Sequence, residues 1–188
     1  MPTENNYEYQ PPEIRAPVSE IEMQNGLAYY QEHKKQLAVA AAVTSNNANS
    51  WRDKPFKVGC ALLTIGENTP EGEYVVFNAY NFKPEPGDVK GWKKRCAERN
   101  AVQDALERKT RAIISITTSS TETHTGDPTK AHDALHPCLE CRQMFRDLLK
   151  NGVLKNESII CNANHTDPKN IVMEERTVGE LLELYKDD

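Results

Sequence analysis

Apolar and polar residues alternate along the chain with two periods, one typical of helices and one typical of strands. Ser19 is a suitable helix N-cap, and apolar residues follow it at helical intervals as far as Val43. This region predicts one long helix or two short ones. Residues 57–65 and 73–78 are rich in β-formers and are separated by a turn region, so they predict a hairpin.

The same two patterns continue through the second half of the chain. They predict strands over 112–118 and 157–162, and helices that begin near Cys96, run from Pro137 to about Asn151, and run from Val178 to about Tyr185. Thr177 and Glu180 have the spacing of a capping box for the last helix. The resulting order of elements predicts an α/β fold, a three-layer α-β-α sandwich around a mixed sheet.

Segments without apolar periodicity bound this domain. Residues 1–17 are proline-rich and predict a flexible N-terminal tail, which leaves 18–188 as a single domain. Segments 83–94 and 119–136 are polar and longer than most connections in compact domains. We expect both long loops to border the functional site.

Charge and hydropathy restrict the partners of the protein. The net charge of −5 disfavours polynucleotide binding, which requires a basic face. No apolar run approaches the ~20 residues of a membrane span, and the N-terminus lacks the layout of a signal peptide. We therefore expect a cytoplasmic protein with a small-molecule substrate and no membrane partner.

The chain has five cysteines, and an odd count in a protein without a secretion signal favours metal binding or free thiols over disulfides. Cys60 and Cys161 lie inside strand patterns, where we expect small buried hydrophobes. The other three are found in the segments 96–99 (Cys-Ala-Glu-Arg) and 137–143 (Pro-Cys-Leu-Glu-Cys-Arg-Gln). A Cys-x-x-Cys pair alone could be a redox dithiol, but the third cysteine favours a metal.

Zinc bound by thiolates takes four tetrahedral positions, and a hydrolytic site leaves one of them to water. Cys96, Cys138 and Cys141 supply three ligands, whereas a structural zinc would use a fourth Cys or His. Glu98 lies two residues beyond the first ligand, so it can reach the water without binding the metal. This is the layout of zinc deaminases. A non-catalytic zinc-binding module is the alternative, and such a module has no need of Glu98.

Both zinc motifs and their surroundings resemble the cytidine deaminase family, in the all-cysteine form typical of its small tetrameric members. Residues 56–62 (Phe-Lys-Val-Gly-Cys-Ala-Leu) resemble the family's Phe-x-Val-Gly-Ala-Ala-Leu strand, and residues 177–182 resemble its closing helix. The resemblance implies a zinc-dependent aminohydrolase of pyrimidine salvage. It would convert cytidine or deoxycytidine to the uracil nucleoside with release of ammonia, and it would be a homotetramer.

The resemblance also implies roles for individual residues. Glu98 would carry the proton, and Arg99 would hydrogen-bond a zinc thiolate. Phe56 would pack against the base, although a core aromatic is the alternative for this position. Asn78 would hold the sugar, although it could equally be a turn residue at a strand end.

Position 80 departs from the family. The usual ribose motif is Asn-x-Glu, and here it reads Asn78-Ala79-Tyr80. Tyrosine at this place resembles blasticidin S deaminase, so a modified cytosine nucleoside or nucleoside antibiotic is the alternative substrate. We expect Tyr80 to contact the substrate, unless it points into the core and Asn81 or a loop residue binds the sugar.

Three histidines occur in the second long loop or at its end, namely His124, His132 and His136. Histidines scattered through a polar loop are usually solvated, so we do not expect a second metal site. His136 differs only because it precedes Pro137 and so lies beside the predicted zinc.

Overall fold

The structure, a computed structural model, describes residues 16–48, 57–82, 96–121 and 135–188. Its elements follow the order α1 (Glu20–Ser45), β1 (Val58–Ile65), β2 (Val75–Tyr80), α2 (Ala97–Glu107), β3 (Ala112–Ser120), α3 (Leu139–Lys150), β4 (Leu154–Asn164), β5 (Val172–Thr177) and α4 (Val178–Leu184). None of the described helices is long and apolar enough to cross a membrane.

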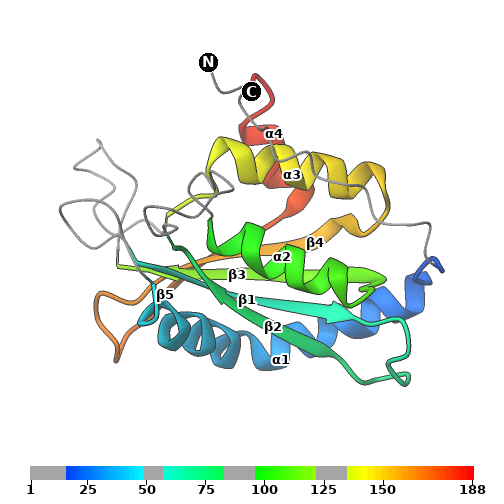
Figure 1. Ribbon diagram of the computed structural model, residues 1–188, viewed down its shortest axis with the longest axis horizontal. Helices are drawn as coiled ribbons and strands as arrows, with labels where there is room; N and C mark the ends of the chain where they lie inside the picture. Colours follow the sequence, from blue (N-terminus) through cyan, green and yellow to red (C-terminus); the bar gives the residue numbers. More distant parts are fainter. Residues whose placement is uncertain (1–15, 49–56, 83–95, 122–134) are drawn as a thin grey trace, which may run out of the picture.

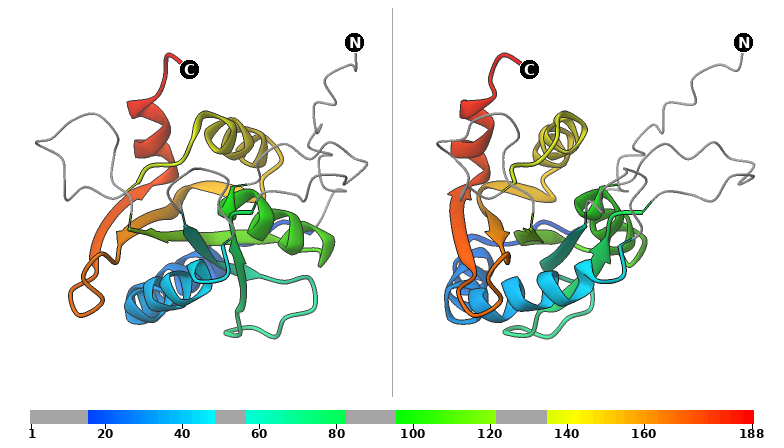
Figure 2. Two further views of the ribbon diagram at one scale, coloured as in Figure 1. Left: turned by 60° about the vertical axis from the view of Figure 1, so that its left-hand side comes forward. Right: turned by 90° about the vertical axis from the view of Figure 1, so that its left-hand side faces the viewer.

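The strands form one mixed sheet in the order β2-β1-β3-β4-β5, in which only the β3–β4 pair among these neighbours is parallel. Helix α1 covers one face of the sheet, and α2, α3 and α4 lie on the other (Figures 1 and 2). The predicted three-layer α-β-α sandwich with a mixed sheet is therefore confirmed.

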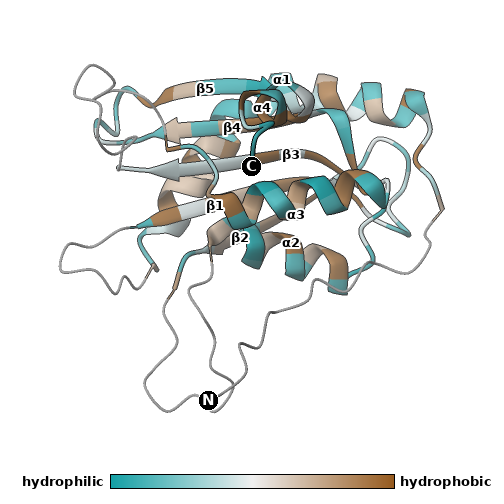
Figure 3. Ribbon diagram, turned by 90° about the horizontal axis from the view of Figure 1, so that it is seen from above, coloured by the Kyte–Doolittle hydropathy of each residue, from teal (hydrophilic) through white to brown (hydrophobic). Residues whose placement is uncertain are grey.

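Two apolar clusters fill the spaces between these layers. One lies between the sheet and the helices α2, α3 and α4, and includes Leu62, Ile116, Phe145 and Leu181. The other lies between the sheet and α1, and Tyr30 is fully buried in it. Helices α2 and α3 alternate hydrophilic and hydrophobic residues along their length (Figure 3), as expected for helices with one face on a core.

A capping box and an arginine that immediately precedes β3 hold the start of α1 in place. The Ser19 hydroxyl accepts a hydrogen bond from the backbone N–H of Glu22, and the Glu22 carboxylate accepts one from the N–H of Ser19. Arg111 pairs with Glu22 and also donates to the backbone carbonyls of Ala16 and Pro17. The last two residues assigned to the tail are thus held against the domain, whereas residues 1–15 of that predicted tail lie outside the described residues.

Strand β5 is absent from the predicted elements, because its sequence does not alternate between apolar and polar residues. It lies at the edge of the sheet and carries three consecutive charged residues, each with an ionic or hydrogen-bonded partner. Glu174 contacts His136, and Glu175 accepts hydrogen bonds from Tyr30 and Lys34. Charged edge strands are common because they discourage pairing with other chains.

Several boundaries also differ from the predicted ones. Strand β3 continues through Ser120, so the predicted loop 119–136 begins two residues later than expected. Helix α3 begins at Leu139 rather than Pro137, because Cys138 is its N-cap. The predicted loop 83–94 lies outside the described residues.

Candidate active site and metal centre

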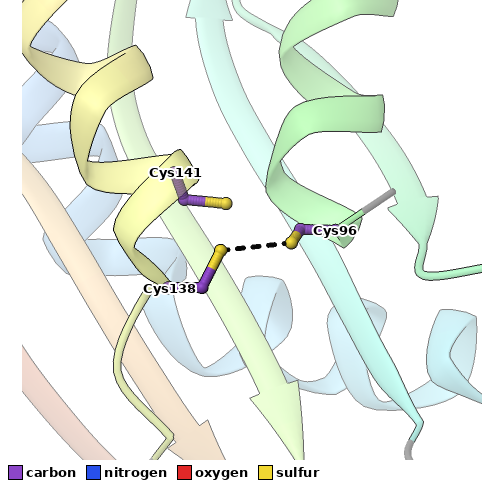
Figure 4. A group of neighbouring side chains, drawn as sticks. All are labelled: Cys96, Cys138 and Cys141. Carbon is purple, nitrogen blue, oxygen red and sulfur yellow. Dashed lines mark hydrogen bonds between the residues drawn. The ribbon is translucent and has the colours of Figure 1, made fainter. Parts of the chain in front are cut away.

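The two cysteine motifs meet where α2 and α3 begin (Figure 4). Cys96 is the N-cap of α2, Cys138 is the N-cap of α3, and Cys141 lies in the first turn of α3. Their three Sγ atoms lie within 4.8 Å of one another, and those of Cys96 and Cys138 are 3.3 Å apart. The starts of the two helices therefore bring all three cysteines of the predicted zinc site together.

Local backbone conformation aims these sulfurs at one another. Cys96 and Cys138 have extended φ/ψ values of −72°/152° and −69°/167°, as N-caps do, but neither side chain makes a capping hydrogen bond. The sulfurs are thus available to a common ligand rather than to their own helices. The positive ends of both helices favour negative charge at this point.

The cluster fits zinc in spacing and chemistry. Tetrahedral coordination at about 2.3 Å places sulfurs roughly 3.8 Å apart, close to the spacing seen here. A hydrogen bond with Cys138 raises the pKa of the Cys96 thiol, a separate hydrogen bond with Cys138 raises the pKa of the Cys141 thiol, and burial adds to both shifts. Three crowded thiols therefore resist joint ionisation unless a cation binds them, and thiolates prefer soft metals such as zinc.

Glu98 lies beside this cluster without being one of its three sulfur donors. It occupies the first turn of α2 and is only 7% exposed. Burial raises the pKa of Cys60 on β1, and the charge of Glu98 adds to that shift and to the raised pKa values of Cys96 and Cys141, so the carboxylate lies near all three thiols. A buried carboxylate next to a metal site is placed to exchange protons with a ligand of that metal.

The second zinc helix carries a similar glutamate with a different environment. Cys138 is followed by Glu140 as Cys96 is followed by Glu98, so both helices begin with Cys-x-Glu. Glu140 is exposed and pairs with Arg99 at 2.7 Å, linking α2 to α3. The structure thus gives Arg99 a carboxylate partner, and its predicted hydrogen bond to a zinc thiolate stays a prediction.

A polar row crosses the sheet on the face that carries these helices. The strand registers align Cys60 with Thr118, Thr118 with Asn162, and Asn162 with Glu174. Thr118 and Asn162 are buried, and the Thr118 hydroxyl donates to the Asn162 side-chain oxygen at 3.0 Å. The sequence pattern did not predict this pair. The signal was polar residues at the carboxyl ends of two strands, where open α/β sheets bind ligands.

The residues expected to bind the sugar do not face this row. Phe77 and Ala79 of β2 pack into the same cluster as Cys141, whereas the strand alternation leaves the side chains of Asn78 and Tyr80 exposed and outside that cluster. Tyr80 is 36% exposed and does not point into the core. Asn81 is buried, and its side-chain oxygen accepts a hydrogen bond from the backbone N–H of Val58.

Asn78 instead lines a groove of about 410 Å³ between β2 and the C-terminal half of α2, together with Val75, Val76, Phe77, Asp104, Glu107 and Arg108. Asp104 and Glu107 lie roughly 12–17 Å along the helix from Cys96. The groove is therefore remote from the thiols, and the sugar-binding role of Asn78 rests on the family resemblance. Phe56 lies outside the described residues.

His136 is held on both sides of its ring rather than solvated. Its Nε2 lies 2.7 Å from a carboxylate oxygen of Glu174, and its Nδ1 lies 2.6 Å from the hydroxyl of Tyr185. Because a carboxylate only accepts, Nε2–H donates to Glu174 and a neutral ring accepts from Tyr185 at Nδ1. His124 and His132 lie outside the described residues.

Comparisons with known proteins agree with this site. Residues 30–153 match the family described as the cytidine and deoxycytidylate deaminase zinc-binding region. Curated protein sequences give no significant match.

Solved structures of cytidine deaminases also resemble the chain. The enzyme from Burkholderia pseudomallei is 23% identical with a TM-score of 0.54, over 78% of this chain and 94% of that one. The enzymes from Mycobacterium leprae and Mycobacterium tuberculosis are 17% and 20% identical, each with a TM-score of 0.47. The former match covers 80% of this chain and 95% of that one, and the latter covers 79% and 93%. At 23% identity, the match to the Burkholderia pseudomallei enzyme supports the fold alone.

The family match spans well over half of the chain, and it contains all three thiols and Glu98. The chain therefore belongs to the cytidine and deoxycytidylate deaminase family of zinc-dependent aminohydrolases.

Proposed function

We propose that the protein hydrolyses the amino group of a cytosine nucleoside, cytidine or deoxycytidine, giving the uracil nucleoside and ammonia. The observation that carries this proposal is the buried carboxylate of Glu98 beside three convergent thiols. A zinc ion that served only the fold would need no carboxylate beside its thiols, and burying a carboxylate there is costly.

The chemistry divides between the metal and the chain. Zinc held by Cys96, Cys138 and Cys141 would supply a Lewis acid that lowers the pKa of bound water. Glu98 would accept a proton from the attacking water and deliver it to ring nitrogen N3. It would then pass the second proton of the water to the departing amino group. One water is consumed and one ammonia leaves, so Glu98 ends in its starting state.

The test is Glu98→Gln, which keeps the size of the side chain but cannot carry the proton. Turnover should fall by about 10²–10⁴ or more, because general acid–base groups are worth that much per step. Zinc content and the unfolding midpoint should remain those of the wild type. The readouts are ammonia release with cytidine and deoxycytidine, and zinc per chain by elemental analysis.

The matched control is Glu140→Gln, which makes the same charge change at the same position of the other zinc helix. Because Glu140 is exposed and only pairs with Arg99, we expect turnover within a few-fold of wild type. Equal losses of turnover in the two variants would mean that Glu98 has no special role in catalysis. Normal turnover in Glu98→Gln would overturn the proposed mechanism.

A second substrate class rests on the family resemblance alone: Tyr80 stands at the place of the family's ribose-binding glutamate, although its side chain lies outside the cluster that contains Cys141. A neutral tyrosine offers one hydroxyl where a carboxylate would make charged hydrogen bonds, which are worth roughly 1.5–3 kcal/mol. Cytidine should then be bound weakly, and sugar-modified nucleosides such as blasticidin S should be tolerated. The measurement is the ratio of kcat/KM for cytidine and blasticidin S, in wild type and Tyr80→Glu. An unchanged ratio would mean that Tyr80 does not read the sugar.

The assembly proposed with this function is a homotetramer. Helix α4 leaves Leu184 59% exposed, and the first turn of α3 leaves Leu139 46% exposed, close to the thiols in sequence. Single exposed leucines are common on protein surfaces, so the proposed assembly rests on the resemblance to the small tetrameric members of the family. Light scattering that returned the 21.2 kDa mass of one chain would contradict this assembly.

A further inference from the structure

The last turn of the chain contacts the start of the second zinc helix through one arginine. Arg142 follows the ligand Cys141, and its side chain is only 12% exposed. Its Nη1 donates to the backbone carbonyl of Pro137 at 2.6 Å. Its Nε and Nη2 donate to the two carboxylate oxygens of Asp188 at 2.5 and 3.1 Å, and its guanidinium lies 3.9 Å from the centre of the Tyr185 ring.

The same last turn also contacts the residue that precedes Pro137, which is a histidine. Tyr185 contacts His136, which precedes Pro137 and is itself anchored to Glu174 on β5. Cys138 is therefore flanked in sequence by two residues, His136 and Arg142, that are both held by the segment after α4.

Packing alone does not require these polar contacts. Helix α4 is already attached to the core by Val178 and Leu181, which are both fully buried. Asp188 is an exposed residue as a whole, yet its side chain is only 17% exposed and takes a second ion pair from Arg146. A bidentate carboxylate fixes the plane of a guanidinium. Because that guanidinium also holds the carbonyl of Pro137, the contact restrains the residue immediately before Cys138.

We propose that Tyr185 and Asp188 are positioning residues for the zinc site, which hold the 137–141 turn so that Cys138 and Cys141 stay in ligating geometry. The inference rests on the same zinc site as the proposed function, but not on any substrate. It predicts that the rate of zinc loss depends on the last turn of the chain. Partners of metal ligands typically change metal affinity about 10- to 100-fold, and residues one step further out should have smaller effects.

The test uses the zinc-loaded full chain and no substrate. Zinc release to an excess of the chromogenic chelator 4-(2-pyridylazo)resorcinol is timed for wild type, Asp188→Asn, Tyr185→Phe and the double variant. We expect release to be about 3- to 10-fold faster in each single variant and about 10- to 100-fold faster in the double variant. Asp188→Glu, which keeps the carboxylate, should recover part of the loss.

The matched control is Asp187→Asn, the same change at the exposed neighbouring residue, which should release zinc at the wild-type rate. A second readout separates positioning from general stability. In cobalt-substituted protein, the visible bands of tetrahedral thiolate coordination should shift in the double variant but not in the control. The unfolding midpoints of the variants should stay near that of wild type. Tyr185→Phe removes only one hydroxyl, so this variant keeps the test valid if Asp188→Asn folds poorly.

Wild-type zinc release and an unchanged cobalt spectrum in the folded double variant would overturn the inference. That result would leave the proposed function intact, because the wild type would still hold zinc and turn over. A wild-type protein that held no zinc would instead overturn both.

Discussion

Gly59 of β1 lies directly against the backbone of α1, and Gly59→Ala tests how rigid that contact is. A Cβ atom at Gly59 would lie 1.8 Å from the backbone oxygen of Ala41 and 2.7 Å from the backbone nitrogen of Ser45, both on α1. Side-chain carbons essentially never approach other heavy atoms below 3.0 Å. The helix would have to move away from β1 by roughly 1.2 Å, which would open the packed layer around Tyr30.

The cost follows from what the new methyl group meets. Overpacking a core usually costs about 1–3 kcal/mol, when side chains can rotate out of the way. At Gly59 the obstacle is backbone of a 26-residue helix, which cannot rotate locally. We therefore expect Gly59→Ala to lower the free energy of unfolding by at least about 3 kcal/mol, a large share of the ~5–15 kcal/mol of a typical domain.

Gly26→Ala is the matched control, because it adds the same methyl group next to a different neighbour. A Cβ atom at Gly26 would lie 2.5 Å from Cδ1 of Ile114, the far end of a flexible side chain. Alanine is also about 1 kcal/mol better than glycine inside a helix. These effects oppose each other, so Gly26→Ala should stay within about 1 kcal/mol of wild type.

Urea denaturation of the zinc-loaded protein measures both variants, provided that the slope of unfolding free energy against urea is unchanged. Near-equal stability of Gly59→Ala and Gly26→Ala would refute the reasoning, since it would mean that α1 moves away from β1 at little cost. A large loss in Gly26→Ala alone would show that Ile114 is the rigid neighbour.

Two further predictions concern titratable groups. Burial lowers the pKa of His165, which contacts the hydroxyl of Ser119 at 2.7 Å. The unfolded chain therefore takes up a proton at higher pH than the folded protein does, so the free energy of unfolding should fall as pH drops through about 6.5. His165→Gln should lose less urea resistance than wild type between pH of about 7.5 and 5.5. Ellman's reagent should titrate almost no thiol in zinc-loaded protein and three more after chelation, with Cys60 and Cys161 reacting only on unfolding; early reaction of five would contradict their burial.

Local sequence was sufficient to predict the three cysteines of the metal site and the helices that carry them. Cys-x-Glu and Cys-x-x-Cys specify spacing within a few residues, and a helix start converts that spacing into direction. The same holds for Thr177, whose hydroxyl accepts from the backbone of Glu180 in the capping box expected for α4. These features depend on neighbours along the chain, which a sequence shows directly.

Features that depend on distant residues were not predicted. Strand β5 has a charged sequence and becomes a strand because β4 supplies its ladder and because Tyr30 and Lys34 of α1 satisfy Glu175. The buried pair of Thr118 and Asn162 exists only through the register of two parallel strands. No local pattern encodes such a register, since it is set by the burial of whole faces.

The two Cys-x-Glu motifs show where local sequence stops determining chemistry. Glu98 and Glu140 occupy the same position of their helices, two residues after the cysteine at the N-cap position. The sheet lies beneath Glu98, where Cys60 of β1 is close enough to be affected by its charge, whereas Glu140 faces solvent and Arg99. One carboxylate is therefore desolvated at the thiols, and the other is an exposed partner in an ion pair. A desolvated carboxylate beside a metal site suits proton transfer, so burial by the sheet, rather than the motif, favours Glu98 for the role proposed above.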